Sequence, residues 1–538
     1  MFENPFANRS YLVIDDFGDM RTMIKGLLRA LGGTVIDAAR DGAEAIDLME
    51  KTRYDVILCD YNLGSGKDGQ QVLEEARHRK LIDLATVFVM VTAENTREMV
   101  MGAVDYEPDN YLAKPFTKDL LRTRLERLFQ RKHDLLPISR AVAKQDYANA
   151  LQLIEERIAA NPKNLSDLTK LHADICIEAG LLDQAATIYE QVLNRRDVAW
   201  ARLGMGKVYF ARKAYAEAEQ VFANLVRDVN TLTAAYDWLA RTQRALGDLQ
   251  GAQATLEQAV TLSPKVIKRQ QVLGDLALTN DDLAMAEQAF GDAVRLGRHS
   301  VYSHPSMHAG LATAKSAAGK HDEALEVIGR IGKTFENSDE ALFFMLSAEA
   351  GIRQNQGDTD AAETSFAAAA QLYQEMGQAA PRQLGLEFAR TASRLGKAEK
   401  SAEILKAVIR NNHDDDDFIA EATEVYRSTG TSENAEDAVK DIRQEIASMN
   451  NHGVRRIREG DLDAAISIFG QAADAMPGNT TINLNAARAM ILKMERHGLD
   501  KAMSLQVRDY IAQIKRLAPD DHRLHWVTEH FQKLVLGS

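Results

Sequence analysis

Three alanines recur at one fixed interval and limit what the middle of this chain can form. Ala218, Ala252 and Ala286 lie 34 residues apart, each three residues after a tyrosine or leucine and four before a large apolar residue. Small residues at such positions mark where two helices of a pair cross closely, and the large residues fill the gap between neighbouring pairs. Because one helix pair cannot bury its apolar face alone, such units stack into a superhelix.

The same interval continues in the preceding helices and, more weakly, along the flanks. Three small residues, Gly206, Ala240 and Gly274, are also spaced 34 residues apart. Copies lie around Tyr147 (ending at Pro162), Leu182, Ala324, Ala362, Ser401 and Leu462. The intervals from Ala286 to Ala324 and on to Ala362 are 38 residues, which predicts longer helices or inserted loops there. We expect about eight to ten units, clearest over 199–300, with a departing helix over 432–447 whose N-cap is Ser432.

Residues 1–132 follow a different pattern, in which short apolar runs alternate with helical segments. The runs are at 11–15, 35–36, 55–60, 86–91 and 111–113, and the helical segments at 20–31, 43–49, 72–79 and 120–129. Continuous apolar runs are typical of strands buried on both faces. This alternation predicts a five-stranded, doubly wound parallel sheet.

Polar residues stand where these strands end. Asp15 and Asp16 follow the first strand, and Asp60 ends the third. Thr92 follows the fourth strand, and Lys114 the fifth. Since the carboxyl ends of parallel strands share one edge of the sheet, we expect these five side chains to converge on one pocket.

The residue types indicate phosphoryl chemistry. Three neighbouring carboxylates repel one another, so the pocket favours a hard divalent cation such as Mg²⁺. A carboxylate beside that metal can accept a phosphoryl group, while Lys114 neutralises charge on the transferring oxygens. Thr92 can donate its hydroxyl to a phosphoryl oxygen, Ala93 leaves room for the group, and the Lys114–Pro115 bond is a candidate cis peptide.

Residues 10–130 resemble the receiver domain of two-component response regulators, a flavodoxin-like fold whose simplest members are the single-domain chemotaxis regulators. The resemblance rests on four motifs: Asp15-Asp16, the run DVILCDYN that contains Asp60 and Asn62, Val91-Thr92-Ala93, and Tyr111-x-x-Lys114-Pro115-Phe116. It implies that Asp60 accepts a phosphoryl group from a histidine kinase or phosphotransfer protein.

The resemblance also implies the remaining roles. Asp16, Asp60 and the Asn62 backbone carbonyl would bind Mg²⁺ directly, and Asp15 would bind it through water. Thr92 and Tyr111 would form the switch pair. The loop 62–69 departs from the family because it lacks a Met-Pro pair and is slightly longer, so we expect it to be less constrained.

Residues 133–538 resemble the tetratricopeptide repeat in period and residue pattern, so the chain is expected to be a receiver followed by an all-α repeat solenoid. The short linker at 132–137 favours a receiver packed on the first repeats, and one continuous helix is compatible with it.

Composition limits the output. The net charge is −13 and no helix-turn-helix follows the receiver, and both observations disfavour nucleic-acid binding. No apolar stretch is long enough to insert into a membrane and no signal peptide begins the chain, so we expect a cytoplasmic protein. Cys59 and Cys176 are interpreted as packing residues. The clusters 413–417 and His522, His525 and His530 are interpreted as a solvated loop and as unrelated histidines.

Together these patterns predict a response regulator in which phosphorylation of Asp60 gates protein binding in the repeat groove, with no enzymatic activity beyond receiver phosphotransfer and autodephosphorylation. The alternative left open is a constitutive scaffold whose receiver acts as a phosphate sink. A receiver phosphatase hidden in the repeats and a transcription regulator are further alternatives, and both are disfavoured.

Overall fold

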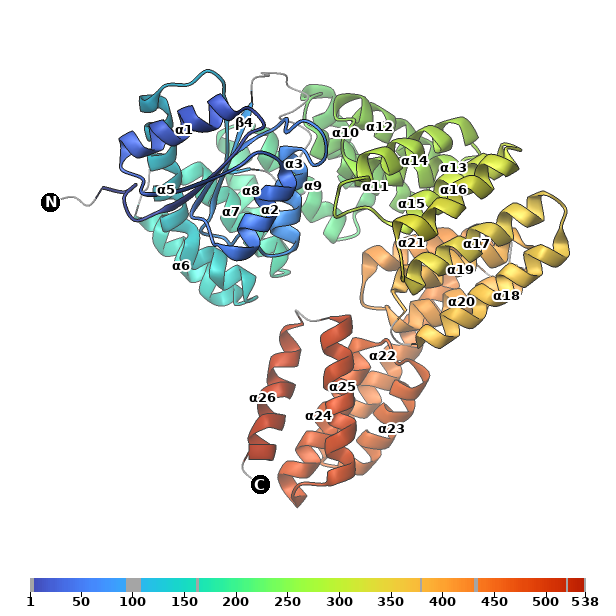
Figure 1. The fold of residues 1–538 in the computed structure, drawn as a ribbon. Helices are drawn as coiled ribbons and strands as arrows, with labels where there is room; N and C mark the ends of the chain where they lie inside the picture. Colours follow the sequence, from blue (N-terminus) through green and yellow to red (C-terminus); the bar gives the residue numbers. More distant parts are fainter. Residues whose placement is uncertain are drawn as a thin grey trace. The chain divides into compact units, whose positions relative to one another are not determined.

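The computed structural model describes residues 4–92, 108–160, 164–377, 380–429, 434–518 and 521–536. The chain divides into two compact units, residues 1–307 and 308–538. Figure 1 shows the sheet of the first unit and the helices of both units.

The first unit begins with a five-stranded parallel sheet in the order β2-β1-β3-β4-β5. Its strands are β1 (Ser10–Ile14), β2 (Val35–Ala39), β3 (Val56–Asp60), β4 (Val87–Thr92) and β5 (Asn110–Ala113). Every residue of β3 and β4 is buried, as their continuous apolar sequences require. The predicted doubly wound, flavodoxin-like fold is confirmed.

Of the helices that the structure describes, two cover each face of this sheet (Figure 1). The helices α1 (Gly18–Leu31) and α5 (Lys118–Ala143) pack with Val13, Leu58 and Val89 on one face. The helices α2 (Gly42–Lys51) and α3 (Gly69–His78) pack with Leu12, Ile57 and Phe88 on the other. This layering leaves the carboxyl edge of the sheet to the loops that follow the strands.

One continuous helix joins the receiver to the repeats. The first half of α5 places Leu121 and Leu125 in the receiver core, and its second half places Ile138 and Ala141 in the core of the first repeat. Pro137 lies inside this helix. The expected division between residues 132 and 133 therefore falls within α5.

The repeats consist of consecutive antiparallel helices. In the first unit they are α6 (Tyr147–Ala159), α7 (Leu165–Glu178), α8 (Leu182–Arg195), α9 (Ala199–Ala211), α10 (Tyr215–Asp228), α11 (Thr233–Leu246), α12 (Leu249–Leu262), α13 (Ile267–Thr279) and α14 (Leu283–Gly297). The division at residue 307 lies in α15 (Pro305–Ala317).

The second unit continues the array. Its helices are α16 (His321–Thr334), α17 (Asp339–Asn355), α18 (Thr359–Met376), α19 (Arg382–Arg394), α20 (Ala398–Asn411), α21 (Asp416–Arg427), α22 (Ala435–Glu459), α23 (Leu462–Ala475), α24 (Thr480–His497), α25 (Lys501–Leu517) and α26 (His522–Leu536). The interval from Ala324 to Ala362 is 38 residues because α17 has 17 residues, whereas the interval from Ala286 to Ala324 includes the longer loop 298–304 between α14 and α15.

A small residue on the first helix of a pair receives a large side chain from the second. A Cβ atom added to Gly206 would lie 2.5 Å from the ring of Phe222, and one added to Gly274 would lie 2.8 Å from Phe290. The same arrangement joins Gly453 and Phe469 near the end of the array. Close approach of paired helices thus depends on these positions.

One predicted boundary needs correction. The departing helix is α22, which begins at Ala435, and its N-cap is Asn434, whose side chain accepts from the Asp437 amide. The capping assigned to Ser432 is therefore wrong for this helix, although Ser432 itself, like Ala93 and Pro162, lies outside the described residues.

Candidate functional site

Three carboxylates meet at the carboxyl edge of the sheet. Asp15 and Asp16 follow β1, and Asp60 is the last residue of β3. One oxygen of each carboxylate lies within 4.8 Å of the others. Asp15 and Asp60 are buried, whereas Asp16 is exposed, so the group opens to solvent on one side.

Lys114 bridges the two buried carboxylates. Its Nζ atom lies 2.7 Å from Asp15 Oδ2 and 2.8 Å from Asp60 Oδ2. Its backbone amide donates to the Thr92 carbonyl at 2.8 Å, and the following peptide bond to Pro115 is cis. The ammonium group is thus held between both acids from the end of β5.

Burial and charge act in opposite directions at this site. Burial raises the pKa of the Asp60 carboxyl, and the hydrogen bond and charge of Lys114 oppose that rise. Burial lowers the pKa of Lys114, but its hydrogen bonds to Asp15 and Asp60 more than offset this, so the net shift is upward. The pocket therefore keeps a cation beside the acceptor carboxyl.

The donor set fits Mg²⁺. All three side chains supply hard oxygen ligands, and the close approach of their oxygens is what a small divalent cation needs. Among the residues that the structure describes, this is the group of three or more His, Cys, Asp or Glu side chains placed to hold a metal. The Asn62 side chain accepts from the Gly64 amide at 3.3 Å within the adjacent loop.

The two predicted switch residues lie on neighbouring strands. Thr92 ends β4 and is buried. Tyr111 pairs with Met90 in the β4–β5 register and packs, half-buried, against the core that contains Phe88. Thr92 pairs with Ala113, so Tyr111 lies on the neighbouring strand two residues before the partner of Thr92.

The loop that follows Asp60 is closed at its two ends. The Gly69 amide donates to the Tyr61 carbonyl at 2.8 Å, and a Cβ atom at Gly69 would lie 2.2 Å from the Asp60 carbonyl oxygen. Asp68 caps α3 in a reciprocal capping box with Gln71. The glycine lets α3 begin directly against the backbone of the acceptor residue.

Two residues beside the site were not predicted from the sequence. The guanidinium group of Arg21 donates to the Asp15 carbonyl at 2.5 Å, which is consistent with its place on the first turn of α1. Lys265, from the repeats, lies with its Nζ atom 5.0 Å from the centre of the Tyr61 ring. Its sequence context, a turn between two repeat helices, gave no signal for this contact.

The other polar clusters have structural partners. His413 pairs with Asn479 at 2.9 Å, Asp414 accepts from Thr481, and Asp415 caps α21. His530 stacks on Trp526, and His525 is exposed beside Glu529. Nothing in these contacts indicates a metal.

Comparison with known proteins places both parts of the chain. A response regulator receiver domain model matches residues 11–126, and tetratricopeptide repeat models match residues 171–231 and 233–266. The chemotaxis protein CheY-3 of Vibrio cholerae is 34% identical over 124 residues, which cover 23% of this chain and 94% of that protein. CheY of Pseudomonas aeruginosa is 35% identical over 120 residues, covering 22% and 95%.

Two solved structures are similar to parts of this chain. CheY4 of Vibrio cholerae matches 22% of this chain and 98% of its own at 28% identity and a TM-score of 0.21. A tetratricopeptide repeat protein from Parabacteroides merdae matches 45% of this chain and 92% of its own at 14% identity and a TM-score of 0.30.

The site and fold define a receiver module joined to a helical repeat array. The chain belongs to the response regulator family, with a CheY-like receiver domain followed by tetratricopeptide repeats. Among the described helices, none has the length and apolar character needed to cross a membrane.

Proposed function

We propose that this protein is a phosphorylation-controlled adaptor: Asp60 receives a phosphoryl group from a histidine kinase or phosphotransfer protein, and its state controls protein binding by the repeats. The observation that carries the proposal is the pocket in which Lys114 bridges Asp15 and Asp60 beside the exposed carboxylate of Asp16. A cytoplasmic location and the lack of any other enzymatic activity belong to the same proposal.

Each residue of the pocket has a part in the transfer. A carboxylate oxygen of Asp60 attacks phosphorus, and the bond from phosphorus to the donor nitrogen breaks with its electron pair on the donor. Asp15, Asp16, Asp60 and the Asn62 carbonyl would hold Mg²⁺, which when bound supplies neutralising charge for the phosphoryl oxygens. Lys114 contributes a fixed ammonium group, and the Thr92 hydroxyl donates to a phosphoryl oxygen.

The gating step is a shift between two populations. Phosphorylation adds charge and acceptor oxygens at the end of β3, and Lys114, Thr92 and Tyr111 are the residues placed to respond. A change in the receiver alters the repeats only if it has different interactions with them in the two states. The repeats then bind or release a protein partner without new chemistry.

Phosphoryl uptake from radiolabelled acetyl phosphate with Mg²⁺ tests the first half of the proposal. The wild-type chain should incorporate label, and Asp60→Asn should abolish incorporation because it removes the nucleophilic oxygen. Asp19→Asn, in the first turn of α1, is the matched control and should label normally. Retained labelling of Asp60→Asn would move the acceptor to another residue.

A further inference from the structure

The face of α3 that turns away from the sheet packs on the repeats. Gln71, Glu74 and His78 are spaced three and four residues apart and so share one face of this helix. The Gln71 side chain donates to the Leu296 carbonyl at 3.2 Å, and the ring of His78 lies 6.3 Å from that of Tyr302 in an edge-to-face arrangement. All these residues belong to the first compact unit.

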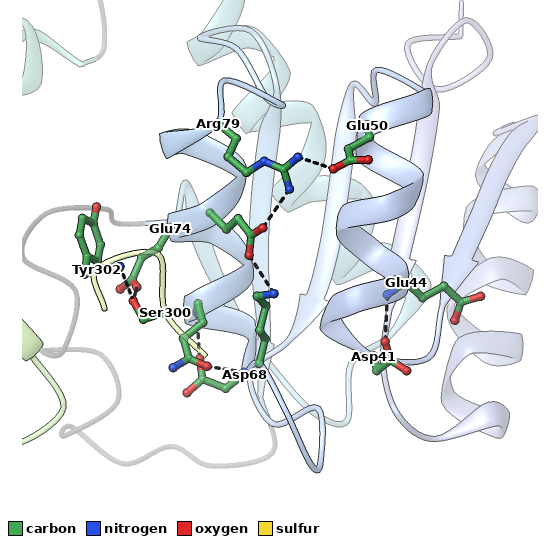
Figure 2. A network of polar contacts seen from close by, with 11 residues as sticks. Asp41, Glu44, Glu50, Asp68, Glu74, Arg79, Ser300 and Tyr302 are labelled. Atoms are coloured by element: carbon green, nitrogen blue, oxygen red, sulfur yellow. Dashed lines mark hydrogen bonds and ion pairs between the residues drawn. The ribbon is translucent and has the colours of Figure 1, made fainter. Parts of the chain in front are cut away.

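Two loops of the repeats supply the other side. Figure 2 shows Ser300 and Tyr302 beside Glu74, with the Ser300 hydroxyl 3.5 Å from the Glu74 carboxylate. Leu296 is in the last turn of α14, where backbone carbonyls have no partner within the helix. Side chains of α3 therefore form hydrogen bonds with polar groups of the segment 296–302 at the end of a repeat helix.

The second loop reaches the segment next to the acceptor. Lys265, in the turn between α12 and α13, has its Nζ atom 3.4 Å from the Tyr61 hydroxyl. It also lies close enough to Asp68 for its charge to oppose the burial that raises the Asp68 pKa. Tyr61 directly follows Asp60, and Asp68 precedes the glycine that packs on the Asp60 carbonyl.

We propose that Lys265 couples phosphorylation of Asp60 to docking of the receiver on the repeats, and that phosphorylation tightens this docking. The inference rests on the proposed function, because it needs Asp60 to be the acceptor. No further element separates the acceptor from the contact: the loop 61–68 carries both. Added negative charge at the end of β3 strengthens the attraction for the lysine that faces this loop.

Reciprocity follows from thermodynamic linkage. If phosphorylation tightens docking, docking stabilises the phosphorylated state by the same factor. Lys265 is exposed on its repeat, so its contribution is that of a surface charge. We expect phosphorylation to change the equilibrium constant for docking by about two- to fivefold, and added salt to weaken this effect.

Hydrogen exchange of the full chain, with Mg²⁺ and with or without beryllofluoride as a phosphoryl mimic, tests the proposal. Exchange in 69–78 and 296–302 should slow when beryllofluoride is added. Lys265→Ala should remove that slowing and Lys265→Arg should retain it. Lys268→Ala is the matched control, since Lys268 is an exposed lysine three residues further along, and it should behave as wild type.

Two results would overturn the inference: faster exchange of these segments on adding beryllofluoride, or the same response in Lys265→Ala and Lys268→Ala. Failure of the proposed function is distinguishable. If the proposed function is wrong, beryllofluoride will not change hydrogen exchange around Asp15, Asp60 and Thr92. The Lys265 contact is tested separately in Mg²⁺ alone, where Lys265→Ala should accelerate exchange of 69–78.

Discussion

At the scale of single residues, the chemistry depends on a buried carboxyl group that must ionise. Asp60 is largely removed from water, and burial is the main cause that raises its pKa. Lys114 is the compensating charge, bonded to Asp60 and Asp15 alike. Protonation of Asp60 and loss of Lys114 should therefore have different consequences.

Magnesium affinity should fall with pH sooner than for an ordinary aspartate. Only the ionised carboxyl binds the metal well, so binding is complete above the raised pKa of Asp60 and is lost as pH falls through it. Titration calorimetry with Mg²⁺ over a pH series that runs down to the usual aspartate value, about 3.9, measures this dependence. Asp60→Asn should bind Mg²⁺ more weakly and with less pH dependence; a wild-type affinity that falls only at the usual aspartate value would contradict the assignment.

Lys114→Ala should separate metal binding from the response to phosphorylation. Removing the ammonium leaves three carboxylates without a competing cation, so Mg²⁺ should bind at least as tightly as in the wild type. The hydrogen-exchange response to beryllofluoride should disappear, because the Lys114 ammonium group is no longer there to bind the oxygens or fluorines of the bound phosphoryl group or its mimic. Lys118→Ala, on the first turn of α5, is the control; a wild-type response in Lys114→Ala would remove this lysine from the switch.

At the scale of helices, the small residues of the repeats decide how closely a pair packs. Gly274 lies against the Phe290 ring, whereas nothing lies within 4 Å of a Cβ atom added to Gly291. The two glycines are on α13 and α14. They differ in surroundings but not in helical propensity.

This pair of glycines gives opposite predictions for one substitution. Gly291→Ala should stabilise the protein by about 0.5–1 kcal/mol because alanine favours the helix. Gly274→Ala should destabilise it by about 1–3 kcal/mol, because the methyl group displaces Phe290. Denaturant unfolding measures both, and equal effects of the two substitutions would rule out the close packing described for Gly274.

Most elements were predictable because their residues carry strong local patterns. Fully apolar runs such as Val56–Cys59 allow little besides a buried strand, and polar residues at their ends marked the shared edge. The sequence carries a further signal: the glycine precedes its aromatic partner by 16 positions in three close pairs, Gly206 with Phe222, Gly274 with Phe290 and Gly453 with Phe469. The start of α22 was mistaken because serine and asparagine are both good N-caps.

At the scale of the whole chain, the sequence predicted two kinds of structure but not where the compact units divide. The sequence changes character near residue 132, yet α5 continues to Ala143 and serves two cores. The first compact unit combines the receiver with the repeats up to Met307. Contacts such as Lys265 with Tyr61 join residues 204 positions apart, which no local pattern records.

The most direct test of the central claim is partner capture with the 538-residue chain in both states. The chain is immobilised and exposed to lysate with Mg²⁺, with or without beryllofluoride, and Asp60→Asn is treated in the same way as the control. We predict that a protein is retained in one state of the wild type, and that Asp60→Asn shows no such difference. Identical retention in both states would contradict gating and favour a constitutive scaffold whose receiver is a phosphate sink.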